Sequence, residues 1–155
     1  MAEKYREMGS AGDGMKTASA AAAALADAWR AVRSDADTPT WVWAVFDSAS
    51  ATYQVAGTGR LLESFVAFTA EHQDAVLFGG LRVELPGSPR FLHVLFVGES
   101  ASGVKRGKAA LQKTAAFNAF QGAAGEINAS GAGLAGVRDA AAKVLRCAPE
   151  DVVVE

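Results

Sequence analysis

The stretch F-L-H-V-L-F-V-G-E-S-A-S-G-V-K-R-G-K-A-A-L-Q-K-T, residues 91–114, carries the clearest structural pattern in the chain. Its first part, Phe91 to Val97, is a short apolar run rich in β-branched and aromatic residues, which is typical of a strand covered on both faces. Gly98 permits a sharp exit from that strand, and Ser100 or Ser102 can cap a helix by accepting a backbone N–H. The stretch therefore predicts a buried strand that leads into a long helix through a short turn.

The helix predicted after this turn is basic. Four cations occupy nine positions with no acidic residue among them: Lys105, Arg106, Lys108 and Lys113. The whole chain has a formal net charge of −2, so the positive charge is local. Such asymmetry favours an acidic macromolecular partner, whereas a solvated face without a partner is the ordinary alternative for a charged surface helix.

The same helix carries an apolar stripe. At about 100° per residue, four apolar residues fall on one side: Val104, Leu111, Ala115 and Ala119. Arg106 and Lys113 fall nearly opposite, beside Phe117 and Phe120. Lys105 and Lys108 lie at the edge of the stripe, where long stems reach solvent. The pattern predicts that the stripe packs on the sheet and that the cations form an outward row.

The run from Phe96 to Thr114 resembles the signature of the coactosin family, aromatic-x-G-E-x-x-S-G-hydrophobic-x-R-x-K with a Lys-Thr pair five residues on. Phe96 stands where the family usually has tryptophan, and the other signature positions match directly: Gly98, Glu99, Ser102, Gly103, Arg106, Lys108, Lys113 and Thr114. A motif of this length is far more specific than a lone glycine fingerprint. Coactosins belong to the actin-depolymerising-factor homology (ADF-H) group, together with cofilin and twinfilin.

Other segments extend the resemblance to about residues 26–135. The segment Ala28–Asp35, A-W-R-A-V-R-S-D, resembles the end of the first coactosin helix, with Trp29 as a core anchor. The segment Leu77–Val83, L-F-G-G-L-R-V, resembles one of the family's strands. The spacing from Trp41 to Asp47 also matches the family pattern.

The resemblance implies a single ADF-H domain, with a central five-stranded mixed sheet flanked by helices on both faces. It implies a cytoplasmic, cytoskeleton-associated protein that binds actin filaments, whose surface is acidic where this group docks its long helix. The residues that the resemblance assigns to actin binding are Arg90, Lys105, Arg106, Lys108 and Lys113. Arg90 takes the place of a family lysine, and Phe117 stands where coactosins tend to have another lysine.

The remaining elements follow from apolar periodicity and from glycine and proline breaks. Gly79-Gly80 lies inside a strand pattern and predicts a bulge or the close approach of a helix. The order is typical of an α/β (α+β) fold, a mixed sheet between helices. We expect these elements besides the strand and helix above: helix Lys16–Val32, strands Trp41–Phe46 and Thr52–Ala56, helix Arg60–Ala70, strand Val76–Leu85, strand Glu126–Ala129 and helix Leu134–Leu145.

A chain of 155 residues suits one domain with a sizeable core. Residues 1–14 are polar and glycine-containing, which predicts a flexible N-terminal extension. We expect the domain to span residues 15–147 and residues 148–155 to form a tail. That tail either packs as an extended strand or stays loose.

Nothing in the sequence indicates an enzyme. The P-loop, HExxH, GxSxG and CxxC patterns are absent, and His72, His93 and Cys147 stand far apart without ligand or catalytic spacing. We therefore expect no catalytic activity, cofactor or metal. We expect His93 to be a hydrogen-bonded histidine in the core or on the face of the sheet, and His72 to lie in a loop. A single cysteine fits a reducing, intracellular setting.

The expected partners are likewise limited by composition. The mildly acidic chain gives no argument for nucleic acid, and no run approaches the length needed to span a bilayer. We expect a monomer that binds actin filaments. The alternatives are a scaffold of the same fold that binds another protein, and a basic helix that binds acidic phospholipids. Filament pelleting and vesicle flotation separate these three.

Overall fold

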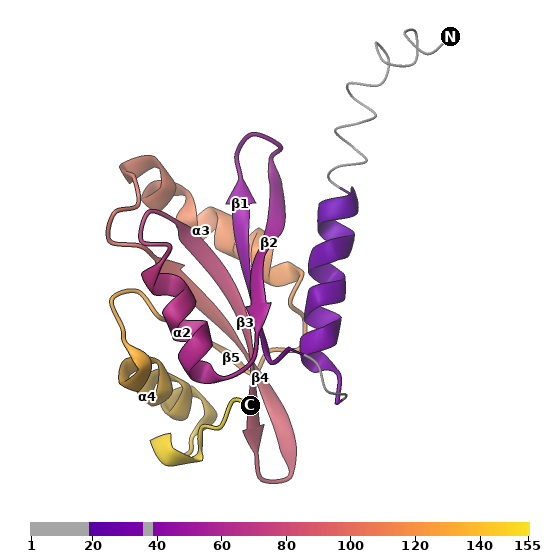
Figure 1. The fold of residues 1–155 in the computed structure, drawn as a ribbon, viewed down its shortest axis with the longest axis vertical. Coiled ribbons are helices and arrows are strands. Elements are labelled where there is room, and N and C mark those ends of the chain that lie inside the picture. Colours follow the sequence, from indigo (N-terminus) through magenta and orange to yellow (C-terminus); the bar gives the residue numbers. More distant parts are fainter. Residues whose placement is uncertain (1–18, 36–38) are drawn as a thin grey trace, which may run out of the picture.

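The structure, a computed structural model, describes residues 19–35 and 39–155. A five-stranded mixed sheet forms its centre, in the order β2-β1-β3-β4-β5 (Figure 1). Its strands are β1 (Trp41–Asp47), β2 (Thr52–Gly59), β3 (Val76–Leu85), β4 (Ser88–Val97) and β5 (Gly125–Asn128). Neighbours pair antiparallel except β4 and β5, which are parallel and joined through the long helix α3 (Gly103–Asn118).

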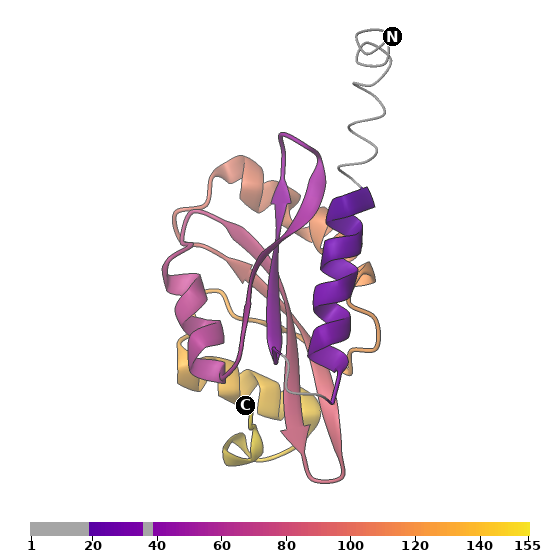
Figure 2. The same ribbon diagram turned by 45° about the vertical axis from the view of Figure 1, so that its right-hand side comes forward.

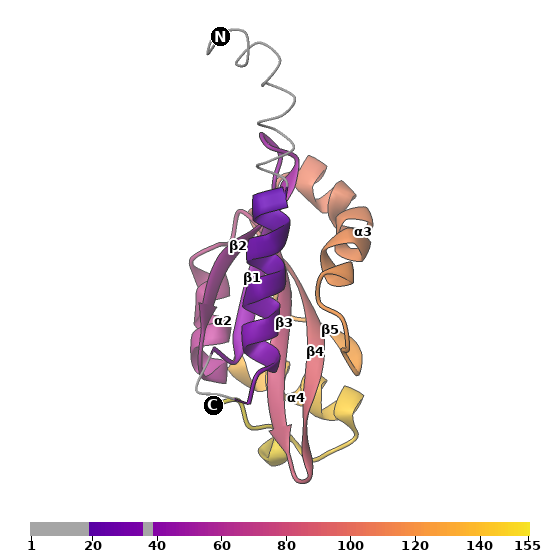
Figure 3. The same cartoon turned by 90° about the vertical axis from the view of Figure 1, so that its right-hand side faces the viewer.

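Helices cover both faces of the sheet, which confirms the predicted fold class. The helix at residues 19–33 and α3 pack on one face, and α2 (Leu62–Ala70) and α4 (Leu134–Leu145) pack on the other. Figure 2 shows the helix at residues 19–33 running alongside the strands, and Figure 3 shows α2 and α3 on opposite sides of the sheet. The first face is filled by aromatic residues: Trp29, Phe78, Phe91, Phe117 and Phe120.

Two glycines in β3 make room for tryptophans. A Cβ atom at Gly80 would lie 2.5 Å from the ring of Trp29, which comes from the helix at residues 19–33. A Cβ atom at Gly79 would lie 2.7 Å from the ring of Trp43. The predicted close approach of a helix is therefore confirmed at Gly80, whereas Gly79 makes room for a side chain of the neighbouring strand β1. Trp29 is 4% exposed, as expected of a core anchor.

Most predicted element boundaries agree with the structure within a few residues. β3 and α4 have the predicted bounds, whereas β2 extends three residues further, to Gly59. The C-terminal tail packs on the domain, because Val152 and Val154 are buried and Val153 forms an isolated bridge with Glu84 of β3. The predicted extension, residues 1–14, lies outside the described residues.

The face of α3 that packs on the sheet is opposite to the predicted one. Ala109, Ala116 and Phe117 are buried, together with Phe120 just beyond the helix. Val104 is 66% exposed and Leu111 is 80% exposed, and Ala115 is also exposed. The prediction was wrong because this alanine-rich helix is apolar on both sides. The two phenylalanines bury more area than the aliphatic pair would, so they set the orientation.

Candidate docking surface on helix α3

The turn between β4 and α3 lies directly on the loop that precedes β3. The backbone N–H of Gly98 donates to the carbonyl of Ala75 at 2.9 Å, and that of Ser100 donates to the carbonyl of Gln73 at 2.8 Å. A Cβ atom at Gly98 would lie 2.1 Å from the carbonyl oxygen of Gln73. The glycine of the signature is thus required by the close contact of two backbone segments.

Ser102 begins the helix. Its extended backbone, φ −63° and ψ 159°, and its hydroxyl, which accepts from the N–H of Lys105 at 3.2 Å, make it the N-cap. Of the two serines predicted as caps, Ser102 takes the role. The turn and the cap together fix the direction in which α3 leaves the sheet.

Arg106 is engaged by that same turn. Its guanidinium donates to three carbonyl oxygens: Nη2 to Gly98 at 2.8 Å and to Glu99 at 2.7 Å, and Nε to Ala101 at 3.1 Å. Charge-assisted hydrogen bonds of this kind are stronger than neutral ones. Arg106 is exposed, as predicted, but its guanidinium is bound to the turn and does not stand free in an outward row of cations. The side chain folds back and holds the turn closed.

Lys113 is paired with an acid from a distant part of the chain. Its Nζ lies 2.9 Å from Oε2 of Glu126 on β5, and the two side chains are 30% and 41% exposed. The expectation that the cations of α3 lack acidic partners therefore fails at this position. The ion pair ties α3 to the last strand of the sheet.

Arg90 lies away from the other predicted cations. It sits in β4 close to the β3–β4 hairpin (Figure 1), about 23 Å along the strand from Val97, at about 3.3 Å per residue. Side chains alternate along a strand, and Phe91 faces the layer that contains α3. Arg90 therefore starts out on the opposite face from α3.

Lys105 and Lys108 remain on the outer side of α3. Lys105 Nζ donates to the carbonyl of Asp74 at 2.9 Å, and both lysines are exposed. Lys108 makes no hydrogen bond or ion pair with any residue of ranges 19–35 and 39–155. Val104, Lys108 and Leu111 follow one another at i, i+4 and i+7, so they share one stripe of the helix.

We call the group Val104, Lys105, Lys108 and Leu111 the α3 surface. Single exposed apolar residues are ordinary, but here two bulky ones lie seven residues apart, beside lysines, on a helix that begins at the Ser102 cap. Sequence reasoning missed them as surface residues. The sequence feature that could have predicted their exposure is the pair Phe117 and Phe120, which lie three residues apart on the other side of the helix.

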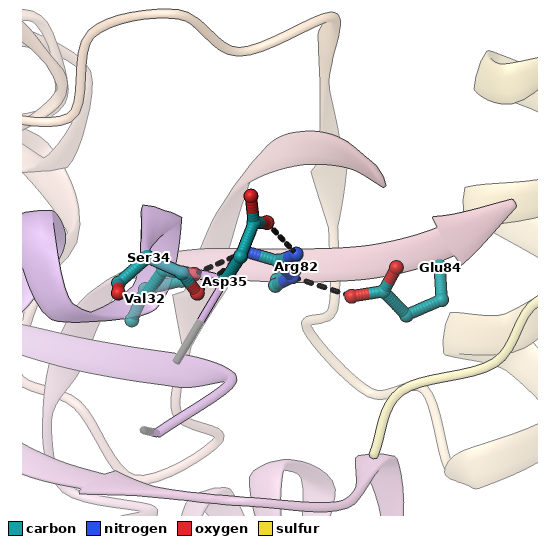
Figure 4. A network of polar contacts seen from close by, with 5 residues as sticks. All are labelled: Val32, Ser34, Asp35, Arg82 and Glu84. Atoms are coloured by element: carbon teal, nitrogen blue, oxygen red, sulfur yellow. Dashed lines mark hydrogen bonds and ion pairs between the residues drawn. The ribbon is translucent and has the colours of Figure 1, made fainter. Parts of the chain in front are cut away.

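Two segments that carry the family resemblance meet at Arg82 (Figure 4). The buried guanidinium donates through Nη2 to Asp35 Oδ1 at 2.7 Å, through Nη1 to the carbonyls of Ser34 at 2.8 Å and Val32 at 3.4 Å, and through Nε to Glu84 Oε1 at 2.5 Å. Burial acts to lower the pKa of Arg82, but the hydrogen bonds and charges of Asp35 and Glu84 outweigh it and raise that pKa. This network joins the end of the first helix to β3.

The histidines have local partners in the structure. His93 Nε2 lies 2.5 Å from the carbonyl oxygen of Phe120, and its ring stacks on Phe117, so it is a hydrogen-bonded sheet residue as predicted. His72 Nδ1 lies 2.7 Å from the carbonyl oxygen of Phe68.

Within the described ranges, no three His, Cys, Asp or Glu side chains gather in a way that could hold a metal ion. No described helix is both long and apolar enough to cross a membrane.

The strand order, the parallel pairing of β4 with β5 and the helices on both faces of the sheet define the structural class of the protein. The described chain has the fold of ADF-H domains, also called cofilin-homology domains. Human coactosin-like protein is similar, with a TM-score of 0.58 and 25% identity over 69% of this chain and 82% of that one. Mouse coactosin, described as an actin filament binding protein, gives a TM-score of 0.55 and 25% identity over 69% of this chain and 75% of that one.

A bacterial protein shares the same fold. Streptomyces griseoflavus cofilin gives a TM-score of 0.63 at 16% identity, over 81% of this chain and 96% of that one. Neither protein-family patterns nor curated protein sequences give a match to the chain. The similarity that these comparisons find is thus one of three-dimensional structure.

Proposed function

We propose that the chain binds actin filaments in the manner of coactosins, through the α3 surface and without catalysing a reaction. The observation that carries the proposal is the exposure of Val104 and Leu111 on a helix whose direction the β4–α3 turn fixes. The similarity to mouse coactosin, an actin filament binding protein, supports the choice of partner. A cytoplasmic location with the cytoskeleton follows from this proposal.

The apolar and the charged residues of this surface have different roles. Fully burying a Val or Leu side chain contributes about 1.5–3 kcal/mol, so Val104 and Leu111 supply most of the affinity. Lys105 and Lys108 act mainly on the association rate and on orientation, because charges at an exposed rim are screened by salt.

The five predicted contact residues divide into three groups in this proposal. Lys105 and Lys108 contact the partner. Arg106 and Lys113 act indirectly, since they hold α3 against the turn and against β5. Arg90, close to the β3–β4 hairpin, belongs to a separate contact in this proposal.

Co-sedimentation with actin filaments tests the proposal. We expect Leu111→Asp to weaken binding by about tenfold or more, because it replaces an apolar side chain at the centre of the interface with a charged one. Ala135→Asp, at an exposed position of α4 on the other face, is the matched control and should bind like the parent chain. Absence of pelleting by the parent chain at low salt would overturn the proposal.

A further inference from the structure

A groove runs beside the α3 surface. It lies between the N-terminal half of α3 and the ends of β1 and β3, and its volume is ≈ 250 Å³. Phe46 and Val76 line it from the sheet side, and Val104 and Gln112 line it from the helix. A volume of this order accommodates one bulky side chain of a partner rather than a large ligand.

The charge on the groove is of one sign. Lys105 and Lys108 line it on the α3 side, and none of the described residues that line it is acidic. Lys105 is held in place by the carbonyl of Asp74, whereas Lys108 has no partner among the described residues. An apolar interior with two lysines at the rim is complementary to an apolar side chain that stands next to a carboxylate.

We propose that this groove is the anchor pocket for an acidic segment of a protein partner, which inserts one apolar side chain between α3 and the sheet residues Phe46 and Val76 and pairs a neighbouring carboxylate with Lys108. The inference rests on the proposed function in one respect, since it makes this pocket part of the contact with the filament. The partner's apolar side chain, desolvated in the groove, supplies affinity. The ion pair between Lys108 and the partner's carboxylate favours acidic segments over neutral ones.

A matched pair of substitutions separates the groove from the rest of the α3 surface. At about 100° per residue, Gln112 and Thr114 lie about 80° to either side of Val104. Gln112 lines the groove, and Thr114 is exposed on the other flank. Gln112→Phe fills the groove and is expected to weaken filament co-sedimentation about tenfold, while Thr114→Phe changes it less than about twofold. Equal effects of the two substitutions would overturn the proposal that the groove is an anchor pocket, but not the proposal that α3 docks on the filament.

A second measurement does not depend on actin. The folded chain is titrated at low salt with a capped tripeptide, aspartate-leucine-aspartate, and followed by amide NMR shifts. We expect shifts at Val76, Lys105 and Lys108, loss of these shifts with Gln112→Phe, and none with a peptide in which glycine replaces leucine. These shifts support the groove even if the parent chain fails to pellet with filaments, which would remove the proposed function alone. Shifts that are absent, or that persist with the glycine peptide, would overturn the groove.

Discussion

Arg82 and Asp35 form an ion pair at 2.7 Å in which only the arginine is buried, with side-chain exposures of 9% and 89%. The same guanidinium donates to the carbonyl of Ser34, so Arg82 closes the end of the first helix against β3. Replacing Arg82 with methionine removes its hydrogen bonds to the carbonyls of Ser34 and Val32. We expect the free energy of unfolding, measured with urea, to fall by about 2–4 kcal/mol.

Asp35→Asn is the matched comparison for that substitution. Asp35 is almost fully exposed, so water and salt already screen its charge, and its loss should cost less than about 1 kcal/mol. If both substitutions destabilise the chain equally, the ion pair matters more than the hydrogen bonds to the helix end, contrary to this account.

Two glycines near α3 should respond in opposite directions to replacement by alanine. Gly98→Ala places a Cβ atom 2.1 Å from a backbone oxygen of Gln73, so the turn must move. We expect a loss of about 1–3 kcal/mol in the free energy of unfolding. At Gly107, inside the helix, an added Cβ meets nothing within 4 Å. Gly107→Ala should therefore raise stability by about 0.5–1 kcal/mol. Thermal unfolding of both variants, with opposite shifts in Tm, is the check.

Arg106 offers a test of positioning against charge. Its guanidinium reaches three carbonyls at once, which a lysine ammonium at the same position cannot reproduce with the same geometry. We expect Arg106→Lys and Arg106→Ala to increase hydrogen exchange at the amides of Ser100 and Ala101 and to weaken filament binding to a similar degree. Full rescue of binding by the lysine variant would show instead that the partner senses the charge directly.

The positions of most helices and strands were predictable because the sequence patterns that set them involve only neighbouring residues. The apolar run of β4, the glycine at its end and the Ser102 cap each follow from a few neighbouring residues. The bounds of β3 and α4 were likewise set by apolar patterns that end at glycine, proline or polar residues. Such features do not depend on what the rest of the chain does.

The orientation of α3 was not predictable in the same way. A helix with alanine on all sides has no single apolar face, so distant residues decide which side is buried. Phe117 packs against Phe78 of β3, with ring centroids 6.1 Å apart, and it stacks on His93 of β4. The partner of Lys113 was equally hidden, because β5 comes beside β4 only through the parallel crossover. The candidate site therefore differs from the predicted row of cations mainly through these long-range contacts.

The salt dependence of filament binding separates the roles of Lys108 and Leu111. Lys108 is exposed and unpaired among the described residues, so its charge acts through the solvent and is screened as the ionic strength rises. Lys108→Gln should lower the association rate and flatten its decline with added salt, measured by stopped-flow mixing with filaments at several salt concentrations. Leu111→Asn should instead raise the dissociation rate and leave the salt dependence unchanged, because it removes buried apolar area without changing charge. Lys143→Gln, on α4, is the charge-matched control and should behave like the parent chain. If Lys143→Gln flattens the salt dependence as much as Lys108→Gln does, the partner responds to net charge rather than to the α3 surface.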